Sequence, residues 1–340
     1  MITHRRISIV SLALIAVVSF VRAQSPAPAV SIVMPPHLLA SSPATIAILG
    51  SDGHLAPGVS VDIGAGQRVT TDATGRAQFT APPNGAFVAS AAGVSATALV
   101  DASPLEGGAA STSVASEVSQ HDAFPICGSG FRGDVNVDSV TINGDPAFVL
   151  AASPVCVVVL AQARTLAGPA KIEIDAGGSH ATASTALVAL DFVPPNPPLL
   201  PGLKGKLFVR AAGTPEPLRI VVENRSPGVI DFLHGETQEL LTSGGSQNGA
   251  PIQVQAIRSG DFSFHARIVA PPNPDDALRY LDIAEGMAPK AQQGTLRTLS
   301  EMLKRHPRDA AKISAALKRL ADSTEPGTLR TLLDAARSAL

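Results

Sequence analysis

The chain has 340 residues, of which 45% are apolar and only 16% charged, and its formal net charge is −2. This length allows two to four domains, and the low charge excludes both a disordered acidic chain and a charge-rich helical rod. A near-neutral balance also argues against a nucleic-acid partner, because nucleic-acid-binding proteins carry a basic surface. Aromatic residues make up 4%, whereas Gly (29) and Pro (28) are frequent, which favours short strands joined by many turns.

Residues 1–23 follow the pattern of a secretory signal peptide. Two arginines precede an apolar run over residues 7–21, and the small residues that follow predict cleavage between Ala23 and Gln24. The run has about 15 residues, fewer than the roughly 20 that cross a bilayer, although an uncleaved anchor remains the alternative. No second apolar stretch of the sequence is long enough to cross a bilayer. The sequence therefore predicts an exported protein without a transmembrane segment after cleavage, located in the periplasm, at the cell surface or in the medium.

The two cysteines, Cys127 and Cys156, are expected to form a disulfide, because export places them in an oxidising compartment. Closing a loop of about 30 residues would stabilise the fold by roughly 3–4 kcal/mol in the chain-entropy model. Two buried free thiols remain the alternative, since both cysteines lie in apolar, strand-like sequence. A metal site is disfavoured because neither cysteine has a His or a second Cys at ligand spacing.

The first folded domain is expected over residues 32–101, after a linker rich in Ser, Pro and Ala over residues 24–31. Short β-type runs follow one another in this domain. They are separated by turn signals such as Asp52-Gly53 and the Pro-Pro-Asn-Gly sequence at 82–85. Many short strands at this spacing predict an immunoglobulin-like β-sandwich.

Three sequences in this domain carry a resemblance to known families: PGVSV at 57–61, TTDATGRA at 70–77 and ASAAG at 89–93. Over residues 40–100 the chain resembles the bacterial immunoglobulin-like domains of the intimin/invasin type. The Thr-Asp-x-x-Gly-Arg turn is shared with the carboxypeptidase regulatory-like domains, so both families stay open. Either resemblance implies a β-sandwich.

The second domain is expected over residues 120–193, after a small, polar, low-complexity linker at 102–119. It contains GSGF at 128–131, VTINGDPA at 140–147 and GPAKIEI at 168–174. With these sequences it closely resembles the IPT/TIG family, the immunoglobulin-like domains shared by plexins, some transcription factors and many bacterial surface proteins. The Asn-Gly pair independently predicts a type I′ hairpin. The cysteine pair is not part of the family pattern.

A third β domain is expected over residues 203–272, after a Pro-rich linker at 194–202. Its apolar residues alternate with polar ones, as at Ile252 and Val254, which is typical of half-buried strands. No specific family is recognised there, and the sandwich-like fold follows from the pattern alone.

The segment 273–340 changes to helical periodicity, with Pro307 and Pro326 where first-turn prolines belong. The sequence GTLRTL at 294–299 recurs at 327–332, which suggests duplicated helical hairpins. The apolar residues of these helices form a candidate interaction stripe: Leu296, Leu299, Leu303, Ile313, Leu317, Leu320, Leu329, Leu332 and Leu333. Because the segment is too short to close a core unaided, we expect the third β domain or a partner chain to cover the stripe. The predicted fold is mainly β, with tandem immunoglobulin-like β-sandwich domains and a small α-helical C-terminal segment.

No residues indicate catalysis. The Gly-x-Ser-x-Gly and His-Glu-x-x-His motifs do not occur. Ser179 and His180 are adjacent, but their flanks predict a hairpin turn and not the strand-to-helix elbow that a serine nucleophile needs. We therefore predict a protein that is not an enzyme and has no cofactor.

Two groups of residues have side chains of the types that bind metals. The first has the spacing of a calcium loop, with Ser139 in place of the turn glycine, and consists of Asp134, Asn136, Asp138 and Asp145. The alternating valines around it also fit a strand. The second group, His234, Glu236 and Glu239, would bind a metal only if the fold brought the three together. Neither group predicts a metal site.

The absence of Trp and the presence of a single Tyr, Tyr280, disfavour a carbohydrate partner, because sugars stack on exposed aromatic rings. Residues 24–195 hold 5 basic and 13 acidic residues, whereas residues 196–340 hold 18 and 15, which permits head-to-tail association between chains.

Two functions remain, and both imply a protein partner. The first is a non-catalytic exported bacterial protein whose tandem domains serve as spacer, adhesion or assembly modules. The alternative is an accessory or docking subunit of an exported enzyme, which would bind through the C-terminal helices.

Overall fold

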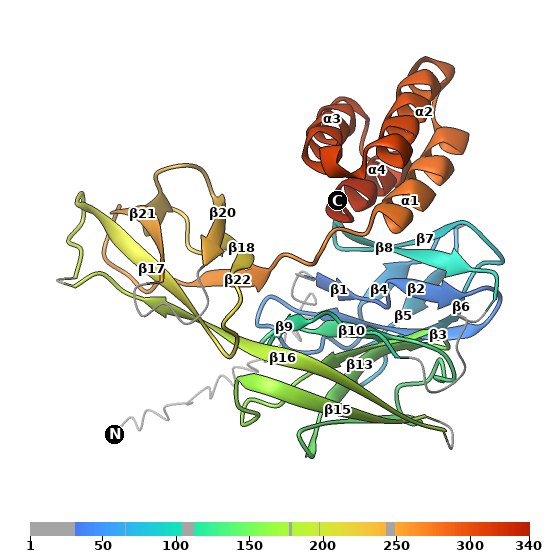
Figure 1. The fold of residues 1–340 in the computed structure, drawn as a ribbon, viewed down its shortest axis with the longest axis horizontal. Coiled ribbons are helices and arrows are strands. Elements are labelled where there is room, and N and C mark those ends of the chain that lie inside the picture. Colours follow the sequence, from blue (N-terminus) through green and yellow to red (C-terminus); the bar gives the residue numbers. More distant parts are fainter. Residues whose placement is uncertain (1–30, 65, 104–111, 177–178, 197, 243–248) are drawn as a thin grey trace, which may run out of the picture.

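The computed structural model describes residues 31–64, 66–103, 112–176, 179–196, 198–242 and 249–340. It confirms a mainly β chain of immunoglobulin-like sandwiches with helices at its C-terminal end (Figure 1). The predicted signal peptide, its cleavage point at Ala23–Gln24 and residues 24–30 of the first linker lie outside the described residues. Within the described ranges, no helix is both long and apolar enough to cross a membrane.

The first domain packs two sheets face to face. One contains β1 (Ser31–Val33), β3 (Pro43–Leu49) and β6 (Arg76–Thr80), and the other has the order β2 (His37–Leu39), β8 (Val94–Asp101), β7 (Ala86–Ala91), β4 (Ser60–Asp62), β5 (Arg68–Thr70). Alternate residues of these strands point inward, where the rings of Phe79 and Phe87 stack with centroids 4.4 Å apart. The turn at Asp72 is closed by its carboxylate, which accepts hydrogen bonds from the backbone N–H of Thr74 and of Arg76.

The second domain is built from eight strands: β9 (Glu117–Ser119), β10 (Phe124–Cys127), β11 (Asp138–Ile142), β12 (Asp145–Pro146), β13 (Phe148–Ser153), β14 (Cys156–Leu160), β15 (Gly168–Ala176) and β16 (Ser179–Val193). Cys127 and Cys156 stand opposite each other on β10 and β14 and form the predicted disulfide. The hairpin between β11 and β12 turns at Asn143 and Gly144, which have φ of 53° and 83°, as the Asn-Gly pair predicted. β9 lies inside the segment expected as a linker and pairs with β16.

The third domain contains β17 (Lys204–Ala212), β18 (Leu218–Asn224), β19 (Ile230–Phe232), β20 (Thr237–Thr242), β21 (Ala250–Ala256) and β22 (Phe264–Ile268). Its sheets have the orders β16-β17-β21-β19 and β20-β18-β22. Residues at period two, such as Leu207, Ile220 and Ile252, are fully or almost fully buried between them.

Strand pairing joins the domains to one another. β3 of the first domain pairs with β13 of the second, with Thr45 opposite Ala152. Residues 179–187 of the long strand β16 pair with β15, and its residues 189–193 pair with β17. One strand therefore belongs to both the second and the third domain (Figure 1). β16 ends at Val193, immediately before the Pro-rich segment 194–202. The three sandwiches therefore share backbone hydrogen bonds and are not connected only by linkers.

The helices are α1 (Pro274–Met287), α2 (Lys290–Arg305), α3 (Ala310–Ser323) and α4 (Thr328–Ser338), with a 3-10 turn at Pro307–Asp309. They fold back over β7 and β8 of the first domain (Figure 1). Along β8, Ala98 and Val100 point into the sandwich, whereas Leu99 points outward and is 1% exposed within the helical core. The expected cover was the third β domain or a partner chain, but the structure places the first domain under the helices.

Candidate functional site

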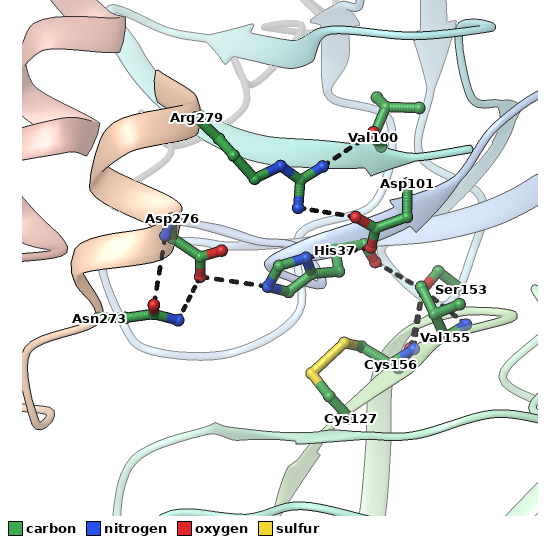
Figure 2. Close-up of polar contacts among 10 residues, drawn as sticks. All are labelled: His37, Val100, Asp101, Cys127, Ser153, Val155, Cys156, Asn273, Asp276 and Arg279. Atoms are coloured by element: carbon green, nitrogen blue, oxygen red, sulfur yellow. Dashed lines mark hydrogen bonds and ion pairs between the residues drawn. A yellow bond between two sulfur atoms is a disulfide. The ribbon is translucent and has the colours of Figure 1, made fainter. Parts of the chain in front are cut away.

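An ionic cluster joins the first domain, the second domain and α1 (Figure 2). His37 lies at its centre, at the start of β2, where strand alternation sends Leu38 into the core and its neighbours outward. Asp101 lies at the end of β8, which runs parallel to β2. Asp276 and Arg279 are three residues apart on α1, so both side chains lie on the same face of the helix.

Both ring nitrogens of His37 contact carboxylates. Nδ1 lies 3.1 Å from Asp101 and Nε2 lies 3.3 Å from Asp276. Arg279 donates to the Asp101 carboxylate at 2.7 Å and to the carbonyl of Val100 at 3.0 Å. The two cations and two carboxylates are therefore balanced in charge, and they tie α1 to β2 and β8.

The second domain reaches the same cluster through Ser153, which is fully buried. Its hydroxyl donates to the backbone carbonyl of His37 at 2.7 Å and accepts from the backbone N–H of Cys156 at 3.0 Å. Cys156 is held in turn by its disulfide to Cys127 (Figure 2). The disulfide thus braces the strand end that contacts the first domain.

The environment keeps His37 protonated. Burial lowers the pKa of His37, but its hydrogen bonds to Asp101 and Asp276 and their negative charges outweigh this and raise it to about 9. For Asp101, burial raises the pKa, but the hydrogen bond and charge of His37 and the charge of Arg279 bring it below its ordinary value. An imidazolium that donates from both nitrogens has no lone pair with which to accept a proton, so the geometry fits a structural clasp better than a general base.

A second polar contact joins the second and third domains. Nε2 of His265, on β22, lies 2.8 Å from Asp122. The hydrogen bond to Asp122 raises the pKa of His265, against the opposing effect of burial. Nδ1 of His265 and the other carboxylate oxygen of Asp122 are buried and have no hydrogen-bond partner among the described residues. This pair connects β22 of the third domain to the second domain.

The acidic residues with calcium-loop spacing make other contacts in the structure. Asp134 accepts from the backbone of Asn136, and Asp145 pairs with Arg164 at 3.0 Å. Asp138 accepts from the backbone N–H of Arg132, and burial raises its pKa to about 6. Across the described ranges, no three His, Cys, Asp or Glu residues are placed to hold a metal.

His180 and Glu239, from the other two candidate sites, also form ordinary ion pairs. His180 pairs with Asp175 at 2.8 Å on the exposed end of β15 and β16. Glu239 pairs with Arg219 across β18 and β20. Among the described residues, Glu239 forms no metal-binding group with His234 and Glu236.

The candidate interaction stripe is not an exposed surface in this structure. Seven of its nine residues are buried in the helical core, and Leu320 and Leu329 are partly buried against it. Residues of α1 complete this core, namely Ala277, Leu281 and Ala284. The helices cover one another because each presents one apolar face, and Leu99 fills the side that faces the first domain.

The sequence patterns did not indicate the ionic cluster. His37 and Asp101 are 64 residues apart, and Arg279 is 179 residues from the Val100 carbonyl to which it donates. The only local signal is the i, i+3 spacing of Asp276 and Arg279, which many surface helices share.

No protein-family model and no curated protein sequence matches the chain. Among solved structures it is similar to the SGBP-B protein of the Bacteroides ovatus mixed-linkage glucan utilization locus, at 12% identity and a TM-score of 0.25 over 69% of this chain and 72% of that one. It is also similar to the plexin A4 extracellular region, at 11% identity and a TM-score of 0.26 over 69% and 22%. A titin I9–I11 tandem is similar at 9% identity and a TM-score of 0.20, over 70% of this chain and 94% of the titin chain. Similarities this weak say nothing about what this chain binds.

Proposed function

We propose that this chain is an exported, non-catalytic bacterial protein that acts as a rigid assembly module, holding its helical segment in a fixed place on three immunoglobulin-like domains. The observation that carries the proposal is the shared strand pairing: β16 belongs to two domains and β3 pairs with β13. Spacer modules on flexible linkers would not need such pairing. A module that presents a surface at a set distance and angle would benefit from it.

The ionic cluster supports the same function. It connects α1 to the first domain through Asp276 and Arg279, while Ser153 connects the second domain to the backbone of His37. Three parts of the chain are therefore held at one point. We further propose that the second domain is of the IPT/TIG type, supported by its hairpin at Asn143–Gly144, with the disulfide as an addition to that pattern.

The test of rigidity uses spin labels on the full-length protein. Cysteines would be introduced in pairs, one at an exposed position of the third domain such as Lys206 and one on α2 such as Lys290, and distances measured by pulsed electron resonance. A rigid module gives a single narrow distance distribution. A broad distribution, like that of a flexibly linked chain, would refute the proposal.

Localisation and partner need separate measurements. Fractionation of cells expressing the tagged natural protein should place it in the periplasm, at the surface or in the medium. The alternative function, docking to an exported enzyme, now requires the outer faces of the helices because the stripe is buried. Cross-linking of the full-length protein in cells would favour this alternative if the cross-linked enzyme attaches to α2 or α3.

A further inference from the structure

A cleft of about 620 Å³ lies between the third domain and the helices. Its floor is the outer face of the sheet β20-β18-β22, which contributes Arg219 and Val221 from β18 and Arg267 from β22. Its opposite wall is formed by α3, the turn before it and the end of α4. This volume falls in the usual range of ligand sites.

The charged side chains that line the cleft are mainly positive. Five of its side chains are cationic and one is acidic: Arg219, Arg267, Arg308, Lys318 and Arg337 against Glu239. α3 begins at Ala310 beside the cleft, so the positive end of its dipole adds to the same potential. Asp309, at this helix end, makes no capping hydrogen bond and turns to Lys312 at 2.9 Å.

The cations can accept new partners. The pairs Arg219–Glu239, at 2.8 Å, and Lys318–Asp322, at 2.7 Å, have side chains that are more than half exposed, and such surface pairs exchange readily. Arg308 forms no ion pair with any described residue. Arg337 pairs with Asp334 at 3.5 Å, and Arg267 lies 4.0 Å from Glu223. The Nε of Arg337 is buried and has no hydrogen-bond partner within the described part of the chain.

The two walls are held in place independently of any ligand. β16 fixes the third domain to the second, and the His37 cluster fixes α1 to the first domain. A cleft whose walls are fixed in advance loses little conformational entropy when it binds.

We propose that this cleft binds an acidic polysaccharide through its carboxylate or sulfate groups. Arginine forks match the geometry of such oxyanions, and the five cations are spread over both walls, as a polymer with repeated charges requires. The uncharged side chains of the cleft are mostly small, among them Ala311, Ser314 and Ala315, and no aromatic residue is among them. A protein partner would need such anchors for its hot-spot side chains, whereas a charged sugar chain does not. The lack of aromatic platforms disfavours neutral sugars but not charged ones.

The test measures binding of the full-length protein to fluorescent oligogalacturonate, which carries carboxylates, and to chondroitin sulfate oligosaccharides, which carry both carboxylates and sulfates. We expect binding to at least one, no binding to neutral dextran, and an affinity that falls steeply between 20 and 300 mM NaCl. The oligosaccharide that the protein binds more tightly identifies the preferred oxyanion. This inference rests on the rigid arrangement proposed above, but a rigid module could lack the ligand, so a narrow spin-label distance distribution without binding to either polymer would overturn this inference alone.

Two charge reversals of equal size locate the site. Arg308→Glu lies in the cleft, and Lys290→Glu changes an exposed lysine outside the lining, at the start of α2. We expect Arg308→Glu to weaken binding by about ten-fold and Lys290→Glu by less than two-fold, at unchanged melting temperatures. Equal losses in both variants, or no binding to either polymer, would overturn the proposal. Tighter binding of a poly-glutamate peptide, or salt-sensitive self-association that Arg308→Glu abolishes, would assign the cleft to a protein partner instead.

Discussion

At the scale of single residues, the charge on His37 couples the position of the helices to pH. Its pKa in the folded protein, about 9, is above the ordinary value of 6.5. A raised folded-state pKa means that the clasp contributes fully below about pH 6.5 and that this contribution is lost as pH rises through 9. The shift corresponds to at most roughly 3–4 kcal/mol, and we expect about 1–2 kcal/mol because water reaches part of the ring.

His37→Gln tests this coupling. We expect the variant to be less stable than the natural protein by about 1–2 kcal/mol at pH 6.5, and by much less at pH 10, where His37 is already neutral. Urea unfolding at both values measures the difference. His180→Gln is the matched control, since His180 also pairs with an aspartate but both side chains are more than half exposed. A difference for His37→Gln that does not change with pH would contradict the charged clasp.

The first two domains approach each other closely at Gly133. A Cβ at this position would lie 1.9 Å from the carbonyl oxygen of Pro43, on β3, and the Gly133 carbonyl accepts from the hydroxyl of Thr45 at 2.6 Å. Gly133→Ala should therefore destabilise the protein by about 1–3 kcal/mol through overpacking. Gly286 lies within α1, and a Cβ added there would have no other heavy atom within 4 Å. Gly286→Ala should therefore stabilise the protein by about 0.5–1 kcal/mol. Urea unfolding that shows Gly133→Ala to be neutral or stabilising would contradict the close approach of the first two domains at this position.

At the scale of secondary-structure elements, the disulfide braces the strand end that meets the first domain. Replacing both cysteines with alanine should lower the free energy of unfolding by roughly 3–4 kcal/mol, because the bridge closes a loop of 29 residues. It should also weaken the contact between the first two domains, since Ser153 bonds to both Cys156 and His37. Reductant should shift the unfolding of the natural protein and leave the double variant unchanged. Two free thiols in exported protein, found by mass spectrometry without reductant, would rule out the bridge.

Local patterns predicted the elements that local physics controls. The Asn143-Gly144 turn, the change of period near residue 274 and the alternation at Ile252 and Val254 all depend on neighbouring residues, and the structure has the expected hairpin, helices and strands there. The pairing of Thr45 with Ala152 depends on two strands distant in sequence, either of which could have ended at a domain edge. No periodicity distinguishes a strand that pairs within its domain from one that pairs outside it.

The same limit explains what the sequence missed at the site. An isolated His, two Asp and one Arg are usually solvated at a protein surface, and only the return of the helices to the first domain brings them together. The apolar stripe was correctly placed on helices, but its cover could not be identified. Leu99 is one leucine in a strand, and its outward direction becomes meaningful only once α1 and α4 lie above β8.

At the scale of the whole molecule, the helices close the chain back onto its first domain. The path leaves the third domain after β22 and returns to β8, where Leu99 enters the helical core and Asp101 enters the ionic cluster (Figure 1). The first domain therefore depends on the last 67 residues of the sequence, 274–340, although the second and third domains lie between them along the chain. This arrangement predicts that changes in the C-terminal helices destabilise the first domain, at the N-terminal side of the sequence.

Deletion of 274–340 tests that dependence. The deletion exposes Leu99 and the neighbouring Ala86, and it leaves His37 with one carboxylate in place of two. We expect the truncated protein to self-associate and its first domain to unfold more readily, while amide exchange in β17, β18 and β21 changes little because their core is separate. Light scattering coupled to size exclusion measures the association. Adding Leu99→Gln to the truncation should restore the monomer, because it removes the newly exposed apolar side chain without altering the core residues Ala98 and Val100 on either side. A truncated protein that is monomeric before this change, with an unaltered first domain, would mean that the helices are not held by β8.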